Sequence, residues 1–409
     1  MLKIHHKNLP STEIGRSLSK SLEIVLSSAS ASAFHEITQR SHLFSESEQL
    51  GSFLKKNYLA FVIIGIGGSS MGARAITEIT GSKKIYFLDN VDSNEFSTVI
   101  TEIKDVPEKT AFLMISKSGS TIEILWNYSA LQNAFKQKFN IDIIKNSFFI
   151  SELVSNTLSD FARLHKRPLL EIPTDIGGRF SVLTPVGLVI AQICGLDLQK
   201  IKIGANNALS SQSLILQFCE LIENSFLRNE NISLFWFYNS KYRWFGAWLQ
   251  QLWAESLGKK ETRTGEKAPD FSTPMIAIGS SDQHSILQQV VHGPKDKYVC
   301  IFDFMTVSRS EWTVPNPLFK EIDFMKDLNY GDLIANQSKA TIEALKLNQV
   351  SCDLFSVNDQ NTAECLGFLF MYFQLVVATL GELHNINAYD QPGVALGKEI
   401  TLSFLKKRF

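Results

Sequence analysis

The sequence has few cysteines and no excess of charge of either sign. Its five cysteines stand at positions 194, 219, 300, 352 and 365, with no CxxC pair and no metal-ligand spacing. This pattern argues against a disulfide framework and favours free thiols in a reducing cytoplasm. Forty lysines and arginines face 41 aspartates and glutamates. Nothing in that balance indicates a nucleic acid or a membrane as partner.

Segments typical of membrane or secreted proteins are also missing. Residues 1–15 lack the apolar core of a signal peptide. The longest apolar run, CLGFLFMYFQLVVATLGEL at 365–383, has Gln374 in its middle and no basic flank after it. Its uninterrupted apolar part is shorter than the roughly 20 residues that a membrane span needs. We therefore predict that this run is a buried helix of a large core.

Short apolar runs do alternate with amphipathic stretches along the whole chain, which predicts parallel sheets covered by helices. The first series of predicted strands lies at 59–65, 84–90, 110–116, 146–151 and 168–173. The second series lies at 232–238, 274–279, 297–304 and 351–357, after a crossing segment at 205–217. The sequence thus predicts an α/β fold with two doubly wound, mainly parallel sheets.

A chain of 409 residues is too long for one ordinary core, so we expect two domains. The first α/β domain, with an N-terminal helical segment, is predicted at 1–204. The second α/β domain is predicted at 205–380. A helical C-terminal tail is predicted at 381–409.

The stretch SKSGST at 116–121 stands between a predicted strand and a predicted helix. Its hydroxyl groups can donate hydrogen bonds, and Gly119 permits a tight turn. The free N–H groups at the start of the following helix complete an anion site. We predict a phosphate site here, with a serine-rich helix cap as the alternative. Lys117 could contact the phosphate or point to solvent.

The stretch GIGGSSMGAR at 65–74 supplies a rival interpretation. It begins like a dinucleotide fingerprint, and Asp89 ends the next strand where a ribose-binding acid would fall. Ser70, however, replaces the third glycine of that fingerprint. The paired glycines ending at Gly68, followed by Ser69, suit a small polar ligand. The motif alone does not decide between a nucleotide and a sugar phosphate.

Residues 244–260 have the apolar spacing of a helix that ends near Gly258. Gln251 and Glu255 are four positions apart and therefore share one face of that helix. A carboxylate beside apolar surface is suited to accept a proton near neutral pH. We predict a general base at Glu255, with a solvated surface glutamate as the alternative.

Three further stretches carry polar side chains suited to a site. DIGGRFSVLTPVGL at 175–188 places Arg179 after a glycine pair, where a tight backbone can aim a guanidinium into a cleft. SSDQHS at 280–285 places His284 where a turn meets a helix. YDQPGVALGK sets Gln391 and Lys398 seven positions apart, so on a helix they would share one face.

Taken together, these motifs resemble the phosphoglucose isomerase family, also called glucose-6-phosphate isomerase, in its bacterial-type short form. GIGGS, SKSGST, GGRFS, ESLGK, DQHS and DQPGVALGK follow one another in the family's order, from about Gly65 to Lys398. GGRFS and ESLGK are the most specific, although ESLGK carries leucine where the long members have asparagine. The resemblance implies two sugar-isomerase domains, a sugar-phosphate substrate, and neither a metal nor an organic cofactor.

The resemblance also implies a role for each residue. Glu255 matches the base that moves the proton, and Arg179 matches the residue that steadies the enediolate. His284 matches the ring-opening histidine, which reaches the site from the neighbouring subunit of a homodimer, and Lys398 lies on the same side of the sugar. The implied substrate-binding residues are Gly68, Ser69, Ser116, Lys117, Ser118, Gly119, Ser120, Thr121, Gln251 and Gln391.

Three functions fit the sequence. The first is isomerisation of glucose 6-phosphate and fructose 6-phosphate. The second is an NAD-dependent oxidoreductase that uses GIGGSS as its fingerprint, which a nicotinamide absorbance change would reveal. The third is a noncatalytic sugar-phosphate sensor. A base and an acid standing together argue against a sensor, because binding alone requires neither.

Overall fold

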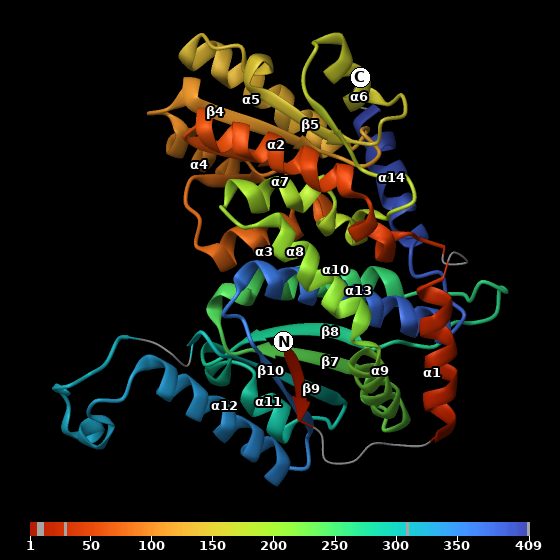
Figure 1. Ribbon diagram of the computed structural model, residues 1–409, viewed down its shortest axis with the longest axis vertical. Coiled ribbons are helices and arrows are strands. Elements are labelled where there is room, and N and C mark those ends of the chain that lie inside the picture. Colours follow the sequence, from red (N-terminus) through yellow and green to blue (C-terminus); the bar gives the residue numbers. More distant parts are fainter. Residues whose placement is uncertain (6–11, 28–30, 308–310, 407–409) are drawn as a thin grey trace.

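Two five-stranded sheets, each covered by helices, form the framework of the molecule (Figure 1). The computed structural model describes residues 1–5, 12–27, 31–307 and 311–406. Both sheets are mainly parallel, as the alternation of strands and helices predicted. The predicted fold class, α/β with two parallel sheets and a helical C-terminal tail, is confirmed.

The first sheet has the strand order β3-β2-β4-β5-β6, and all its neighbouring strands are parallel. Its strands are β2 (Ala60–Ile64), β3 (Ile85–Leu88), β4 (Thr110–Ile115), β5 (Ser147–Ser151) and β6 (Leu169–Glu171). The strand order reverses between β2 and β4. At such a point the loops that follow two neighbouring strands diverge and leave room for a ligand.

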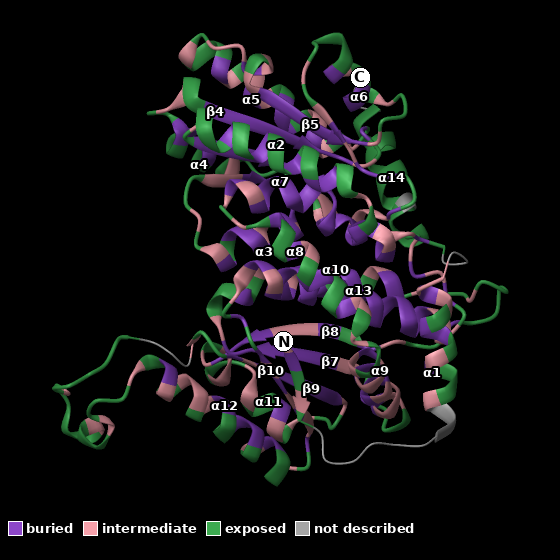
Figure 2. Cartoon of the chain, viewed as in Figure 1, coloured by how far each residue is buried: buried purple, intermediate pink, exposed green. Residues whose placement is uncertain are grey.

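Helices cover both faces of the first sheet because successive side chains of its strands point to opposite faces. One apolar core lies between the sheet and helices α2 (Ser41–Asn57), α3 (Met71–Thr80) and α7 (Pro185–Ile193). The other core lies under α4 (Ser93–Ile103), α5 (Ile122–Phe139) and α6 (Thr157–Leu164). Figure 2 shows the strands buried between these layers.

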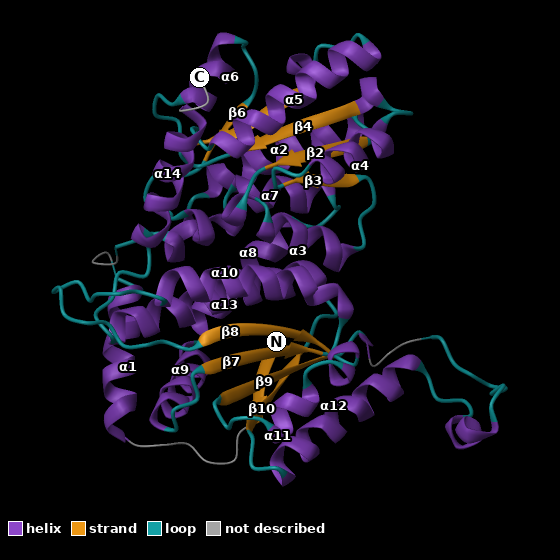
Figure 3. Ribbon diagram, turned by 180° about the vertical axis from the view of Figure 1, so that it is seen from behind, coloured by secondary structure: helices purple, strands orange, loops and turns teal. Residues whose placement is uncertain are grey.

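The second sheet has the order β1-β10-β9-β7-β8. Its strands are β7 (Ile232–Phe237), β8 (Thr273–Ile278), β9 (Lys297–Phe304), β10 (Ser351–Val357) and β1 (Leu2–His5). Helices α9 (Gln212–Leu227), α10 (Arg243–Leu257) and α13 (Thr362–Leu383) cover one face. Helices α11 (Leu287–His292) and α12 (Tyr330–Leu347) cover the other face (Figure 3). Helix α8 (Leu198–Ser210) packs along α13.

The N-terminal segment belongs to the second sheet, which corrects its predicted place in the first domain. Strand β1 pairs antiparallel with β10, with Leu2 opposite Val357. Helix α1 (Thr12–Val25) packs on α13 and α9. The chain therefore starts on the second domain before it builds the first. The domain limits at residues 204 and 380 stay predictions.

The apolar run at 365–383 forms most of α13, as predicted. Among the described helices, α13 is the one long and apolar enough to span a membrane, but 94% of its apolar window is buried inside the molecule. It packs against α1, α8, α9 and α10. Helix α13 is therefore the central helix of the second domain's core.

Candidate active site

Two turns follow β2 and β4 at the carboxyl edge of the first sheet. The two strands are neighbours in register, with Ile64 opposite Met114, so the turns that follow them lie side by side. The turn after β2 forms the short helix η2 (Gly67–Ser69). The turn after β4 is SKSGST, which leads directly into α5. Both predicted ligand turns thus share one edge.

The serine turn at 116–121 is organised by its own hydroxyl groups. The buried Ser116 Oγ accepts a hydrogen bond from the Gly119 N–H at 3.1 Å and lies 3.1 Å from Thr121 Oγ1. Ser118 and Ser120 are exposed. Thr121 stands at the N-cap of α5 but makes no side-chain hydrogen bond to its first turn. The N–H groups of that turn and the exposed hydroxyls are therefore positioned to receive an anion.

Gly119 is required by the shape of this turn. Its φ is +65°, and a Cβ built on it would lie 1.8 Å from Asn156 Oδ1. That oxygen accepts hydrogen bonds from the Leu158 and Ser159 N–H groups and caps α6. Asn156 therefore braces the serine turn from the next loop. Sequence reasoning missed this residue because nothing near 156 marks a contact with residue 119.

Lys117 is neither free in solvent nor turned toward the exposed hydroxyls. Its Nζ donates to the Thr174 carbonyl oxygen at 3.0 Å and lies 3.5 Å from Glu152 Oε1. The side chain thus ties the serine turn to the segment after β6. A phosphate contact from Lys117 stays a prediction, and the pairing with Glu152 counts against it.

Helix η2 and the GGRFS segment, which forms η5 (Gly178–Leu183), approach each other backbone to backbone. A Cβ built on Gly68 would lie 2.3 Å from the Gly178 carbonyl oxygen, so only glycine fits at 68. Ser69 is half-buried beside it. Helix η5 is held from behind, because Gln374 Nε2 of the core helix α13 donates to the Phe180 carbonyl oxygen at 2.9 Å. The polar interruption in that apolar run thus supports the site.

Arg179 occupies the centre of the candidate site, with a side chain that is 1% exposed. Its Nε donates to Ser256 Oγ at 2.7 Å, and its Nη1 donates to Gln391 Oε1 at 3.0 Å. Its Nη2 donates to the carbonyl oxygens of Ala388 and Asp390. Burial lowers the pKa of the guanidinium, while the nearby Glu255 carboxylate opposes that shift. Arginine remains charged in such a setting.

Glu255 faces this guanidinium from α10. Its Oε2 lies 3.4 Å from Arg179 Nη1, and its Oε1 accepts a hydrogen bond from Gln251 Nε2 at 3.0 Å. Gln251 lies against the turn after β2, since a Cβ on Gly67 would be 2.9 Å from its Nε2. The carboxylate is 30% exposed and can reach a bound ligand. Helix α10 ends at Leu257, directly before Gly258, as predicted. Gly258 has a φ of −74°, so it does not adopt the left-handed conformation of a typical glycine cap.

The chain does not bring His284 to Glu255. Helix α10 runs antiparallel to β8, because Trp253 near its end bonds Ser272, which precedes the strand, while Gly246 near its start meets Ile276. Glu255 therefore lies at the start of β8. His284 is exposed and ends the short helix η7 (Ser281–His284), beyond the other end of that strand. Six residues of strand span roughly 20 Å.

Lys398 and Gln391 do not share a helix, which corrects the seven-residue spacing argument. Helix α14 (Ala395–Lys406) starts after Gln391, and the short helix η10 (Pro392–Val394) separates the two. Lys398 is exposed on α14, which lies beside α6 in both ribbon views (Figures 1 and 3). Of these two side chains, it is Gln391 that bonds the buried guanidinium.

The position of Asp89 argues against the dinucleotide-binding interpretation. Asp89 accepts two hydrogen bonds from Arg74, at 2.6 and 2.7 Å, and is therefore occupied. Arg74 also reaches Glu95 at 3.0 Å. This bidentate ion pair gives Asp89 a structural role, which counts against a ribose contact.

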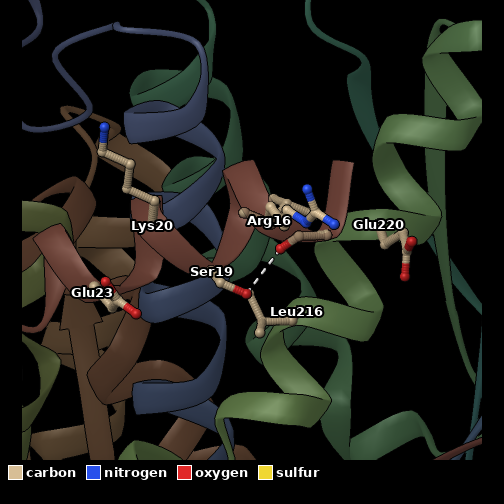
Figure 4. A pocket seen from close by; sticks show the side chains of 8 residues that line it. Arg16, Ser19, Lys20, Glu23, Leu216 and Glu220 are labelled. Atoms are coloured by element: carbon tan, nitrogen blue, oxygen red, sulfur yellow. Dashed lines mark hydrogen bonds between the residues drawn. The ribbon is translucent and has the colours of Figure 1, made fainter. Parts of the chain in front are cut away.

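A hollow of about 540 Å³ lies elsewhere, between α1 and α9 (Figure 4). It is lined by Gly15, Arg16, Leu18, Ser19, Lys20, Glu23, Leu216 and Glu220. None of the candidate residues borders it, and its mixed charges converge on no common point in Figure 4. The candidate site residues therefore lie at the sheet edge and not around this hollow.

Solved structures define the class of protein. A hypothetical protein of Thermus thermophilus is 26% identical and matches 96% of this chain and 94% of its own, with a TM-score of 0.85. A glucose-6-phosphate isomerase of Chlamydia trachomatis has the same fold at 20% identity, matching 96% of this chain and 78% of its own, with a TM-score of 0.76. The fold is that of the phosphosugar isomerases.

Sequence comparison narrows this class to one family. The family model for phosphoglucose isomerase matches residues 16–408. A glucose-6-phosphate isomerase of Campylobacter jejuni is 32% identical over 383 residues, which cover 91% of each chain. The chain belongs to the phosphoglucose isomerase family, and the resemblance that its motifs carry is confirmed.

Proposed function

We propose that this protein interconverts glucose 6-phosphate and fructose 6-phosphate through a cis-enediol. The observation that carries the proposal is a carboxylate, Glu255, held between Gln251 and the buried Arg179 at the edge where the serine turn opens. Family membership and the names of the relatives support the same reaction. The five free thiols support a reducing cytoplasm as its location.

The phosphate of the sugar binds at the serine turn and the start of α5. Ser118, Ser120 and Thr121 donate to its oxygens, and the helix N-terminus favours its charge. Binding this remote group orients the reacting carbons and lowers the entropic cost of the reaction. Gly68, Ser69, Gln251 and Gln391 line the path of the sugar; their contacts with it stay predictions.

Proton transfer then follows in two steps at Glu255. His284 and Lys398 first move the proton that opens the sugar ring. Glu255 accepts the proton from C2 of the aldose, which gives the cis-enediolate, and returns it to C1; a second proton moves from O2 to O1, through the cis-enediol, and the ketose results. Arg179 offsets the negative charge that develops on the oxygens. The electrons stay within the sugar, so the scheme calls for no redox cofactor.

The distant position of His284 supports a homodimer with shared sites. Within one chain this histidine lies at the far end of β8 from Glu255. A second copy related by a two-fold axis would supply its own His284 to the site and receive the same in return. Each site then combines Glu255, Arg179 and Lys398 of one chain with His284 of its partner.

An exposed arm, residues 311–329 before α12, supports the same assembly (Figure 2). Trp312 is 77% exposed, Leu318 is 92% exposed and Phe324 is 83% exposed. Such a cluster of exposed large apolar side chains marks a surface for a partner. The arm leads into α12, whose Gln337 and Thr341 accept hydrogen bonds from Gln283 next to His284. The arm and the segment that carries His284 are thus both joined to α12.

The test is a coupled assay in which fructose 6-phosphate is supplied and glucose 6-phosphate is detected by a dehydrogenase. The proposal predicts turnover that requires both the protein and the phosphorylated sugar. A nicotinamide absorbance change without the coupling enzyme would instead identify an oxidoreductase. Tight binding of fructose 6-phosphate without any turnover would identify a sensor. Either result would end the isomerase proposal.

A further inference from the structure

Lys259 is a buried cation beside the candidate base Glu255. The proposed reaction scheme gives this lysine no role. It stands two positions beyond the end of α10, and its side chain is 7% exposed. Lysine is among the residues that are least often buried, and it is then paired. A lysine in this position therefore requires a structural or chemical reason.

The ammonium group of Lys259 contacts two residues, Glu255 and Asp390. Nζ donates to the Glu255 carbonyl oxygen at 2.6 Å, which ties it to the end of α10. It also donates to the Asp390 carbonyl oxygen at 2.5 Å and lies 3.1 Å from Asp390 Oδ1. Lys259 thus joins the helix that carries the base to the segment that carries Gln391.

The same carbonyl oxygen of Asp390 accepts a hydrogen bond from Arg179 Nη2 at 2.8 Å. Two cations therefore converge on one backbone group. Burial lowers the pKa of Lys259, and the positive charge of Arg179 acts in the same direction, while Asp390 and Glu255 oppose both. Placing the positive charges of Lys259 and Arg179 close together in the interior costs free energy. Their hydrogen bonds to the 388–391 segment offset part of that cost.

These hydrogen bonds to Asp390 lie directly before the exposed C-terminal tail. Tyr389 still packs against the rings of Phe34 and Phe180, with centroids 6.3 and 5.2 Å away. From Gln391 to Lys406 every side chain that the structure describes is exposed. Arg179 and Lys259 are therefore the charged groups that fix the segment just before the exposed tail begins.

We infer that Lys259 is a positioning residue that clamps the 388–391 segment to the end of α10 and so sets Gln391, and the tail that carries Lys398, against the substrate. This inference rests on the proposed isomerase function for its kinetic consequence, but not for its structural one. Lys259 does not contact the sugar in this scheme, because its donors are already directed to protein oxygens.

The first experiment measures hydrogen–deuterium exchange in wild type and in Lys259→Met. Faster exchange is expected in the peptides that cover residues 386–406, with the rest of the chain unchanged. Lys297→Met is the matched control, since the Lys297 side chain is also buried but pairs with Asp296 at the start of β9. Unchanged exchange after residue 386 in Lys259→Met would overturn the clamp, whatever the enzyme's activity.

The second experiment measures kcat and KM for fructose 6-phosphate. A loosened segment misplaces a sugar contact, so kcat/KM should fall about 10- to 100-fold in Lys259→Met, through a lower kcat and a higher KM together. Lys259→Arg keeps the charge and should restore most of the loss. A purely structural role would lower only the amount of active enzyme and leave KM unchanged, and that result would also refute the inference.

Two further variants keep the test decisive. Asp390→Asn alters an exposed side chain, so folding is not threatened; it should shift exchange and KM in the same direction by a smaller factor. Lys259→Met combined with Gln391→Ala should cost little more than the larger single effect, because both act through one contact. Additive effects would contradict the clamp. An inactive wild type with the expected exchange pattern would refute the proposed function and leave the clamp standing.

Discussion

Replacing Glu255 with glutamine tests the proposed base with little change in shape. In the structure Glu255 Oε1 accepts from Gln251 Nε2 at 3.0 Å. In Glu255→Gln the new Oε1 can keep the hydrogen bond from Gln251 Nε2. The new Nε2 can turn to solvent, because the side chain at 255 is 30% exposed. The fold can therefore accommodate Glu255→Gln.

The loss of the ion pair with Arg179 is also tolerable. Its atoms are 3.4 Å apart and the carboxylate is 30% exposed, so solvent screens one partner of a long ion pair. Arg179 keeps its acceptors at Ser256 and Gln391. The loss of proton transfer is far larger, since general-base catalysis contributes about 10²–10⁴-fold in rate.

We therefore expect Glu255→Gln to lose at least ~10²-fold in kcat, with nearly unchanged binding of a sugar-phosphate inhibitor. The coupled assay gives the rate, and inhibitor titration gives the affinity. Glu223→Gln is the matched control, because Glu223 of α9 pairs with His384 rather than with a residue of the candidate site, and it should leave activity intact. Activity of Glu255→Gln within a few-fold of wild type would remove Glu255 from the role of base.

Three other outcomes follow from the site. Ser118→Ala with Thr121→Ala removes two donors to a charged group, each worth ~1.5–3 kcal/mol, and should raise KM for the phosphorylated sugar more than it lowers kcat; unchanged KM would make the turn a helix cap only. Gly119→Ala would place a Cβ 1.8 Å from Asn156 Oδ1, so the turn must change shape. This variant should lose phosphate-dependent binding, which titration with inorganic phosphate will measure. Refolding Glu255→Gln together with His284→Ala should restore part of the activity, because one site of each mixed dimer is intact. Mixed dimers without activity would refute shared sites.

Most of the fold could be predicted because its strands are buried on both faces. Such strands appear as continuous apolar runs, and each predicted run overlaps an observed strand, for example 297–304 and β9. Strand β1 gave no such signal. It is four residues long, alternates Lys3 and His5 with apolar residues, and lies at the edge of the distant second sheet. Its pairing with β10 depends on tertiary structure and not on local pattern.

The candidate site was predictable only where its residues are close in sequence. The four-residue spacing of Gln251 and Glu255 predicted a shared helix face, and their side chains do hydrogen-bond. The spacing of Gln391 and Lys398 gave the wrong answer, because the helix begins only at Ala395. Lys259 was missed because a lysine just after a helix usually lies in solvent, and its burial depends on residue 390, more than a hundred positions away.

The position of Arg179 explains why the site is assembled from three separate segments. The guanidinium comes from η5, beside the first sheet, while Glu255 comes from α10 of the second core and Gln391 from the C-terminal segment. The distance from the base to the phosphate turn therefore depends on how the two cores pack.

That packing is fixed where α3 lies on α10. There Arg74 of α3 is stacked between the rings of Phe87 and Trp244, with its Cζ 4.6 and 4.5 Å from their centroids. The same guanidinium is held by Asp89. Trp244 lies at the start of α10 and Glu255 near its end, so this contact orients the helix that carries the base. Asp89, which the sequence offered as a ribose-binding acid, thus holds Arg74 where α3 packs on the helix that carries the base.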